Sequence, residues 1–486
     1  MRCSRWLAAV VAVVLLAAPA MAQDVPPPPP GPGDDGPPPP PPGPGDDGPP
    51  PPPGPGDDGA PPPPPGPAET QPAKPAAKAP GLTWLGLAGF WEVRGGIRTQ
   101  HDKYQKDASL GETRLQLKYE KPVGPLRVKV TADFLYDAVD DHHTVRLERG
   151  TGWLDLREAS VGFTPADFMD VKVGRQILTW GTGDLLFIND LFPKDWRSFF
   201  IGRDVEYLKA PSDAMKVSLF TGLANVDVVV TPRFDPDRFI RGRRLSYWNG
   251  ALGRVAGRDA VVDPHLPDEW FDDAEWATRV SKNLGGTELA GYGYWGYWKS
   301  PAGMDPASGK ATFPRLSVYG ASVRGQAAGG IANAEAGYYD SRQDRPGDDP
   351  FKANSQVRLL AGYERDLPRI ARDLTVGVQY YVELMMEYDA YRRGLAPGAP
   401  AADEDRHVLT ARIRKLLMNQ NLTVSLFAYF SPTDADAYLR PNVKYKIDDH
   451  WTVEAGGNVM LGSERHTFFG QFRDNSNLYA ALRYGF

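Results

Sequence analysis

The chain has 486 residues, a formal net charge of -6 and a single cysteine, Cys3. Cys3 lies in a segment expected to be cleaved, which excludes disulfides, thiolate metal sites and a cysteine nucleophile from the mature chain. Arg2 and Arg5 leave with that segment, and residues 23–80 carry eight acidic against two basic side chains. About -2 therefore remains from Gly81 onward, too little to mark a nucleic-acid binder.

Residues 1–22 have the pattern of a secretory signal peptide. Arg2 and Arg5 precede an apolar run from Leu7 to Ala18, and the small residues of "APAMAQD" suit cleavage after Ala22. The apolar run is too short to span a bilayer. We expect the mature chain to begin at Gln23.

Residues 23–80 repeat "PPPPPGPGDDG" three times and end in further proline and alanine. Proline at this density cannot build a core and favours extended polyproline II, so we expect a disordered tether. Calcium binding by the Asp pairs is an alternative, but their spacing lacks the ligand pattern of an EF-hand loop. A solubilising spacer is the preferred interpretation.

From Gly81 the apolar residues recur with a period of two. In "LTVSLFAYF", Leu422, Val424 and Leu426 share one face, and Thr423 and Ser425 lie on the other. Other segments repeat the pattern, with charged residues on the second face. Those expected to line the wall of a lumen are Arg114, Lys129, Arg279, Arg358, Arg412 and Arg414.

The pattern favours a transmembrane antiparallel β-barrel over a soluble sandwich, because a barrel turns its apolar face to lipid and its polar face to water. The segments predict about eighteen strands over residues 81–486. Tight links such as "NLGGT" alternate with long ones such as Thr231 to Phe271. Aromatic residues near strand ends suit an interfacial girdle, with ordinary core packing as the alternative. They are Trp91, Tyr136, Trp276, Tyr297, Trp298, Tyr388 and Trp451.

The last strand places Leu482, Tyr484 and Phe486 on one face and ends on an aromatic residue. This ending resembles the signal that Gram-negative outer-membrane proteins present to the barrel-assembly machinery. The resemblance implies Tyr484 and Phe486 as the assembly signal. From this resemblance we expect a barrel in the outer membrane, in contact with lipid and lipopolysaccharide. We expect the tether to lie in the periplasm and to reach peptidoglycan or a periplasmic partner.

No motif predicts catalysis, a metal site or a cofactor. The Gly181-Thr182-Gly183-Asp184 turn follows a strand but lacks both the GxGxxG and the Gly-Lys-Ser/Thr fingerprints. His142 and His143 beside Asp140 could hold a metal, yet adjacent residues of an extended chain point in opposite directions, which favours a solvated loop. No strand carries the His and Ser spacing of a barrel hydrolase.

The loop from Thr231 to Phe271 contains a basic cluster formed by Arg238, Arg241, Arg243 and Arg244. Guanidinium groups pair with carboxylate and phosphate, so the cluster could steer anionic solutes or polysaccharide to a pore mouth. It could equally contact lipopolysaccharide or pair with Asp235, Asp237 and Asp259. Both interpretations stay open.

The third outer loop, Thr179 to Asp213, is expected to fold into the lumen. Its many leucine, phenylalanine and tryptophan residues must pack somewhere, and its charges would line a wet constriction. An inert plug is the alternative. The expected constriction residues are Arg175, Asp184, Asp190, Asp195, Arg197 and Arg203.

The stretch "LREASVGFTPADFMDVKVGRQILTWGTGDLLFINDLFPKDW" resembles poorly characterised Gram-negative porin-like proteins and, more distantly, alginate-export barrels of the outer membrane. The matching positions are Glu158, Gly174, Arg175, Gln176, Trp180, Gly181, Asp190, Pro193 and Asp195. The resemblance implies a passive channel for hydrophilic solutes, anionic ones included. Exopolysaccharide export with a periplasmic or inner-membrane partner, and a barrel that anchors a cell-wall tether, are the alternatives.

Overall fold

The structure is a computed structural model that describes residues 86–140 and 143–486. The expected signal peptide and the whole proline-rich segment lie outside the described residues, as do Asp141 and His142.

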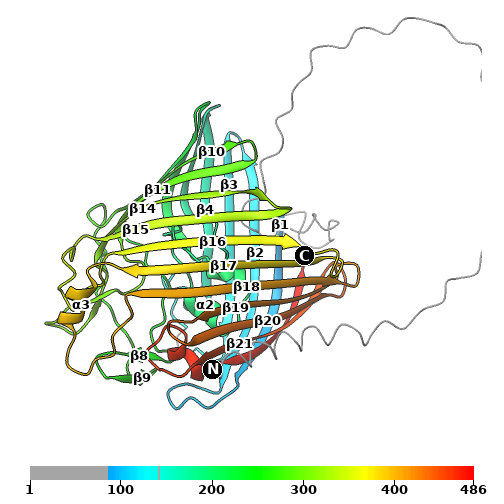
Figure 1. Ribbon diagram of the computed structural model, residues 1–486. Coiled ribbons are helices and arrows are strands. Elements are labelled where there is room, and N and C mark those ends of the chain that lie inside the picture. The colour runs from blue at the N-terminus through cyan, green and yellow to red at the C-terminus, as the bar shows by residue number, and fades with distance from the viewer. Residues whose placement is uncertain (1–85, 141–142) are drawn as a thin grey trace, which may run out of the picture. The chain divides into compact units, whose positions relative to one another are not determined.

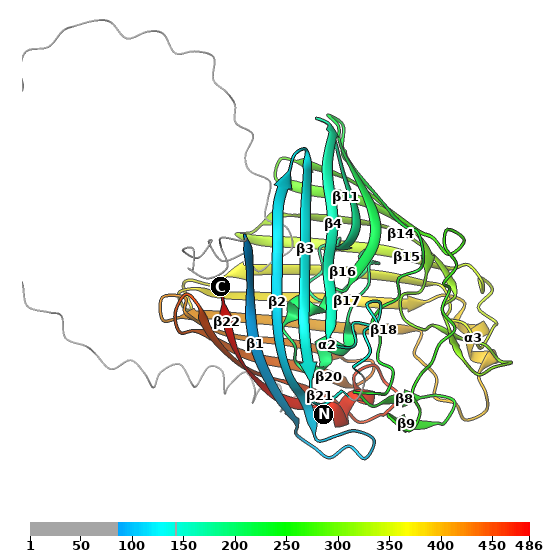
Figure 2. The ribbon, with the colours of Figure 1, turned by 180° about the vertical axis from the view of Figure 1, so that it is seen from behind.

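In the described part of the chain, eighteen strands form one antiparallel sheet in which each strand pairs with the next along the chain. Strand β22 pairs with β1, with Trp91 opposite Tyr484, so the sheet closes into a barrel (Figures 1 and 2). The prediction of an eighteen-stranded all-β barrel is confirmed. The strands of the barrel are β1 (Leu87–Arg98), β2 (Ala108–Val123), β3 (Leu126–Asp137), β4 (Leu154–Ala166), β5 (Met169–Ile177), β6 (Pro211–Phe220), β7 (Asn225–Thr231), β10 (Glu275–Leu284), β11 (Thr287–Tyr297), β14 (Arg315–Ala327), β15 (Gly330–Ser341), β16 (Gln356–Asp366), β17 (Leu374–Met385), β18 (Asp405–Leu417), β19 (Leu422–Ser431), β20 (Asp436–Lys446), β21 (Trp451–Gly462) and β22 (Asn477–Gly485).

The connections differ in length at the two ends of the barrel. Turns such as 124–125 and 285–286 join strands at one end, where β1 begins and β22 finishes. Longer loops project at the other end, on the side of α3 in Figure 1. These loops contain the hairpins β8 (Tyr247–Asn249) with β9 (Arg254–Ala256) and β12 (Gly303–Met304) with β13 (Ala311–Thr312), and the helical segments α2 (Trp196–Ile201), η2 (Val205–Leu208), α3 (Tyr388–Gly394) and η3 (Gly470–Asn475).

The two faces of the wall have opposite chemistry. On β1, Trp91 and Val93 are 39% and 42% exposed, whereas Glu92 and Arg94 between them are 4% and 1% exposed. Successive side chains of a strand point to opposite faces, so the apolar residues of β1 face outward and its charged residues face the lumen. No helix among the described residues is long and apolar enough to cross a bilayer.

The hydrophobic core lies inside the barrel. Ile188, Phe199 and Ile201, from the connection between β5 and β6, pack in one cluster with wall residues such as Tyr339 and Tyr438. Two members of the expected aromatic girdle do not fit that role, because Tyr297 and Trp298 are buried where β11 runs into its loop. Trp91, Tyr136 and Trp276 are exposed on the wall.

Candidate functional site: a loop across the lumen

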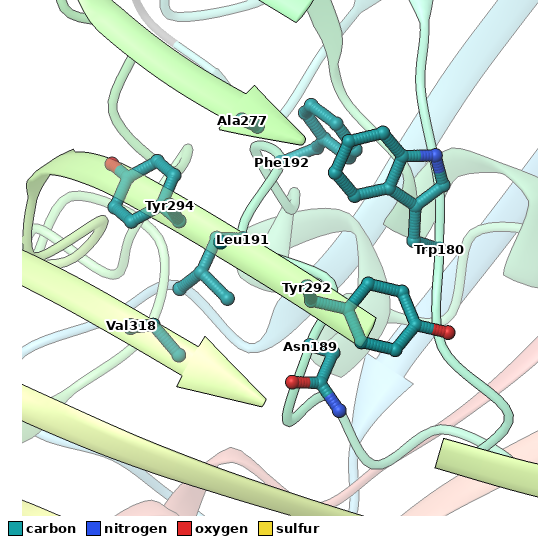
Figure 3. A pocket seen from close by; sticks show the side chains of 9 residues that line it. Trp180, Asn189, Leu191, Phe192, Ala277, Tyr292, Tyr294 and Val318 are labelled. Atoms are coloured by element: carbon teal, nitrogen blue, oxygen red, sulfur yellow. The ribbon is translucent and has the colours of Figure 1, made fainter. Parts of the chain in front are cut away.

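The connection between β5 and β6, residues 178–210, turns into the barrel. Its first part packs on the wall through apolar side chains, and the rings of Trp180 and Phe192 meet edge to face at 4.9 Å. Burying such a side chain stabilises the packed loop by about 1.5–3 kcal/mol. Figure 3 shows this contact, with the loop residues Trp180, Asn189, Leu191 and Phe192 beside Ala277 of β10, Tyr292 and Tyr294 of β11 and Val318 of β14.

The Gly181-Thr182-Gly183 turn binds a carboxylate that belongs to the protein itself. The backbone N–H groups of Thr182 and Gly183 donate to Oε1 of Glu335 on β15, the latter at 2.7 Å. The side-chain amide of Asn189 donates to the other oxygen at 3.1 Å. Gly181 has φ +85°, and a Cβ there would lie 3.0 Å from the carboxylate, so glycine is needed at this position. The glycine turn is thus an anion-binding turn whose anion is Glu335.

The next residues of the loop reach the opposite arc of the wall. Gln379 on β17 accepts from the backbone N–H of Asp184 at 2.7 Å and donates to its carbonyl at 2.9 Å. Arg412 on β18 donates to the Asp184 carboxylate at 2.5 Å. Burial raises the pKa of Asp184 to about 6, and Arg412 only partly offsets that rise. The hydroxyl of Tyr429 on β19 donates to the carbonyl of Leu185 at 2.9 Å.

The second half of the loop is attached to the strands around the closure of the barrel. Arg203 donates to both carboxylate oxygens of Glu112 on β2, at 2.6 to 3.0 Å. Arg94 on β1 donates to the carbonyl of Gly202 at 2.9 Å, and Asn477 on β22 donates to that of Phe200 at 3.1 Å. The loop therefore spans the lumen and is anchored on both sides of it.

A β-bulge on β4 positions two charged residues on the lumen side. The register with β3 shifts between Thr131 and Ala132, so Arg157 and Glu158 both turn inward. Arg157 donates to the carbonyls of Glu206 and Lys209 at 3.2 and 3.0 Å and holds the end of the loop. The bulge has no clear signal in the sequence alone.

Cavities lie on both sides of the loop. Two cavities, of 1340 and 730 Å³, lie between the third loop and the long outer loops and are called the outer cavities. A third cavity of 470 Å³, the inner cavity, lies on the other side of the third loop. Phe187 lines all three cavities, and Asp190 lines the largest and the smallest. These two residues therefore mark the place where the spaces above and below the loop approach each other.

Of the six expected constriction residues, Asp184 and Asp190 line the inner cavity. The other four are used in contacts within the protein. Arg175 donates to Asp213 at 2.7 Å, and Arg197 donates to the carbonyl of Gly150 at 2.7 Å. Asp195 and Arg203 are buried rather than exposed to water, because each lies against opposite charge. Asp195 lies beside Arg197 and Arg238 of the outer loops, and Arg203 pairs with Glu112 on β2.

Asp195 has a structural role at the start of α2. Its carboxylate accepts from the backbone N–H of Ser198 at 2.7 Å, which caps the helix. Burial opposes its ionisation, but Arg197 and Arg238 hold the pKa of Asp195 below its ordinary value. Asp195 therefore stays ionised inside the loop.

The six expected wall residues lie on the charged face of their strands, and five of them form ion pairs with acidic side chains. Arg114 pairs with Asp133 at 2.5 Å and Lys129 with Glu158 at 2.8 Å. Arg414 is exposed, and its charge lowers the pKa of Asp184. The remaining pairs are Arg279 with Glu288 at 2.8 Å, Arg358 with Glu383 at 3.2 Å and Arg412 with Asp184 at 2.5 Å.

The basic cluster of the fourth outer loop divides between the interior and the surface. Arg238 binds Asp155 at 2.7 Å and Arg244 lies 3.4 Å from Glu112, both buried. Arg241 pairs with Asp263 at 3.0 Å, and Arg243 is exposed.

Arg238, Arg241 and Arg244 thus pair with carboxylates other than those of Asp235, Asp237 and Asp259. Asp237 instead accepts from the backbone N–H of Lys194 and the indole of Trp196, and Asp259 pairs with Arg254. The loop enters the barrel beside the third loop, which brings its arginines to carboxylates on β2 and β4.

The C-terminal residues complete the barrel seam. Phe486 and Gly89 exchange two backbone hydrogen bonds of 3.0 Å, and the ring of Tyr484 packs on Trp451 at 4.9 Å. No metal-binding group of His, Cys, Asp and Glu occurs in residues 86–140 and 143–486. His142, of the histidine pair considered for a metal, lies outside that range.

No protein-family model matches the chain, and no curated protein matches it. Several solved barrels are similar in fold. OccD3 of Pseudomonas aeruginosa is 11% identical with a TM-score of 0.47, over 82% of this chain and 91% of that chain. OccAB4 of Acinetobacter baumannii is 10% identical with a TM-score of 0.47, over 82% and 97%. OmpF of Salmonella typhi, solved with daunomycin, is 11% identical with a TM-score of 0.40, over 82% and 97%.

Proposed function

We propose that the protein is a porin-like channel of the outer membrane through which hydrophilic solutes pass passively. The observation that carries this proposal is a closed barrel, apolar outside and charged inside, whose lumen is narrowed by one anchored loop with cavities on both of its sides. A wall with this polarity suits lipid outside and water inside.

In this account the loop sets the width and the field of the pore. Phe187, Asp184 and Asp190 border the space that a solute must cross, and Arg412 faces Asp184 from the wall. Selectivity then follows from pore width and local charge, with flow down the gradient.

The charged lining of the inner cavity is balanced, which supports a channel of weak ion preference over one dedicated to an anionic polysaccharide. Its basic and acidic residues are equal in number. They are Lys118, Arg157, Lys209, Arg324 and Arg412 against Glu158, Asp184, Asp190, Glu206 and Glu364. A strongly basic lumen would be needed to favour large anions.

The orientation of the chain follows from its connections. Outer-membrane barrels have short turns toward the periplasm and longer loops outside. Strand β1 begins at the end with the short turns, so the preceding proline-rich segment would start in the periplasm after removal of residues 1–22. Peptidoglycan or a periplasmic protein would be its partner, and lipopolysaccharide would surround the long loops.

Conductance across a planar bilayer tests the proposal. The purified, folded protein should give discrete ionic conductance steps and should admit small sugars into liposomes. Folded protein that inserts into bilayers without conducting ions would overturn the proposed function.

A further inference from the structure

The outer part of the lumen is lined by aromatic side chains to a degree that a water-filled pore does not need. Phe187, Trp196, Phe200, Trp248 and Phe468 each line both of the cavities above the third loop. The inner cavity, in contrast, is lined mainly by charged and polar residues. The two sides of the loop therefore offer solutes different chemistry.

Several of these rings are held in place yet accessible. The indole N–H of Trp196 donates to Asp237 at 3.0 Å, and Phe187 packs against its ring edge to face at 6.0 Å. Phe468 is 44% exposed, and Trp196, Phe187 and Trp248 are half-buried. Rigid aromatic faces in contact with water bind flat apolar groups at little entropic cost.

The rings come from both sides of the outer cavities. Phe187 and Trp196 belong to the third loop, whereas Trp248 lies on the β8–β9 hairpin and Phe468 precedes η3, at the long-loop end of the barrel in Figure 2. The backbone N–H of Trp248 donates to the side chain of Gln471 at 3.1 Å, which joins the hairpin to the η3 loop. A solute that enters between the outer loops meets these faces before it reaches the constriction.

Polar and charged groups also line both outer cavities. Arg358 and Gln471 line both outer cavities. Arg358 stacks over Tyr339 at 4.0 Å and pairs with Glu383 at 3.2 Å, so its guanidinium is fixed in direction. Such donors suit hydroxyl or ether oxygens on a ring rather than a bare hydrocarbon.

We infer that the outer cavities form a binding site for water-soluble solutes that carry an aromatic ring with oxygen substituents, and that this site loads the pore with them. The inference rests on the proposed channel function and adds its solute class. Phe187 also borders the inner cavity, so the aromatic ring of the solute would pass Phe187 as it moves from the outer cavities to the inner cavity.

Phenyl β-glucoside and methyl β-glucoside are matched probes, because they share the sugar and the lack of charge and differ by the ring. Phenyl β-glucoside should block the ionic current at a concentration about 10-fold lower than methyl β-glucoside. Aromatic pairs contribute about 0.5–1.5 kcal/mol each, and about 1.4 kcal/mol corresponds to a tenfold change in affinity. The double variant Trp248→Ala/Phe468→Ala should raise that concentration about 10-fold and leave methyl β-glucoside unaffected.

Two further variants separate stacking from other effects. Trp248→Leu/Phe468→Leu keeps apolar volume but removes the flat faces, and it should lose the phenyl preference as well. Trp270→Ala changes an exposed tryptophan of the same outer loop that does not line the cavities, and it should behave as wild type. Equal block by the two glucosides, or an unchanged phenyl preference in both double variants, would overturn the inference.

Calorimetric titration of phenyl β-glucoside into the detergent-solubilised full chain gives a readout that does not depend on conductance. Binding that both double variants weaken supports the aromatic site even where no current is seen, and in that case only the channel function fails. Conductance without measurable binding of phenyl β-glucoside overturns the aromatic site and leaves the channel function intact.

Discussion

Glu335 on β15 accepts a hydrogen bond of 2.7 Å from the backbone N–H of Gly183, a residue 152 positions earlier in the chain. This contact fixes the start of the third loop to the wall at the point where the loop enters the lumen. A glycine turn that resembles a phosphate-binding element at first sight thus serves to hold the constriction.

Substitution of Glu335 by glutamine should loosen the loop. The amide keeps the size of the side chain but removes the charge and presents an N–H group to backbone donors. A buried N–H group of the loop then loses its acceptor, which costs about 1–3 kcal/mol. We expect larger current noise and brief steps of higher conductance in single-channel records.

Glu120 offers the matched control, because it lies on β2 near the short turns and pairs with the half-exposed Lys118 at 3.4 Å. Glu120→Gln should leave the current noise unchanged. Quiet, wild-type records from Glu335→Gln would contradict the role given to Glu335.

The pair between Arg203 and Glu112 should contribute strongly to barrel stability. Arg203→Met removes the forked donor and leaves a buried carboxylate with weaker contacts to Arg114 and Arg244. Breaking a buried ion pair on one side costs about 3–5 kcal/mol. The variant should convert to the unfolded, slower-migrating band at a clearly lower temperature in heat-modifiable gel electrophoresis.

Arg345 pairs with Asp340 at 2.8 Å, close to the 2.6 Å between Arg203 and Glu112, but the side chain of Arg345 is 66% exposed. Arg345→Met should therefore shift the conversion temperature much less, since water screens and replaces exposed ion pairs. Equal shifts in the two arginine variants would show that burial does not govern how much an ion pair contributes to barrel stability.

Ion selectivity should change as Asp184 takes up a proton. Its pKa is raised to about 6 by burial, despite Arg412 and Arg414, and Glu364 adds to the rise. Lowering the pH from about 8 to about 4.5 removes this negative charge and should move the reversal potential in a salt gradient toward anion permeation. Because the folded protein binds this proton more tightly than the unfolded chain, the loop arrangement gains stability as pH falls through 6, until free aspartate is protonated as well at about pH 3.9.

Asp184→Asn should make the change of selectivity over that range clearly smaller, and the remainder should come from glutamates such as Glu206, which lines the same cavity and whose pKa burial also raises. Asp204 is the control, because burial opposes its ionisation but Lys444 and Arg483 hold its pKa at about 2. Asp204→Asn should keep the pH-dependent change. A change of undiminished size in Asp184→Asn would assign it to another group.

The C-terminal aromatic residue should matter for assembly more than for the finished barrel. Phe486→Ala keeps the backbone bonds to Gly89 but removes the ring that ends the last strand, so we expect a lower yield of folded barrel in the outer membrane. Phe220→Ala, which removes an exposed ring at the same end of the barrel, should not lower the yield. Equal yields of the two variants would argue against a recognition signal at Phe486.

The architecture could be predicted from local pattern alone. Alternation in strands such as Leu422–Ser431 depends only on neighbouring residues, and the rhythm of short turns and long loops sets the strand number. The inward course of the third loop also follows from its composition, because so much apolar surface cannot remain in water.

The partners of the buried charges could not be predicted in this way. Arg203 meets Glu112 over 91 positions and Arg238 meets Asp155 over 83, across a closed surface whose register the sequence does not reveal. The inward turn of Arg157 requires a bulge on β4, and a shift of one residue exchanges the faces of a strand. Trp298, expected at a membrane interface, lies buried against Tyr339 on β15 and Arg358 on β16.

The central claim is that the loop from β5 to β6 narrows a conducting pore. Single-channel conductance of the full chain, with and without Gly183 to Ser198, tests it most directly once heat-modifiable mobility shows that both proteins are folded. We predict discrete conductance in the intact protein and at least about twofold higher conductance after the deletion, because the wall alone encloses a wider path. The same conductance in both proteins would contradict the claim.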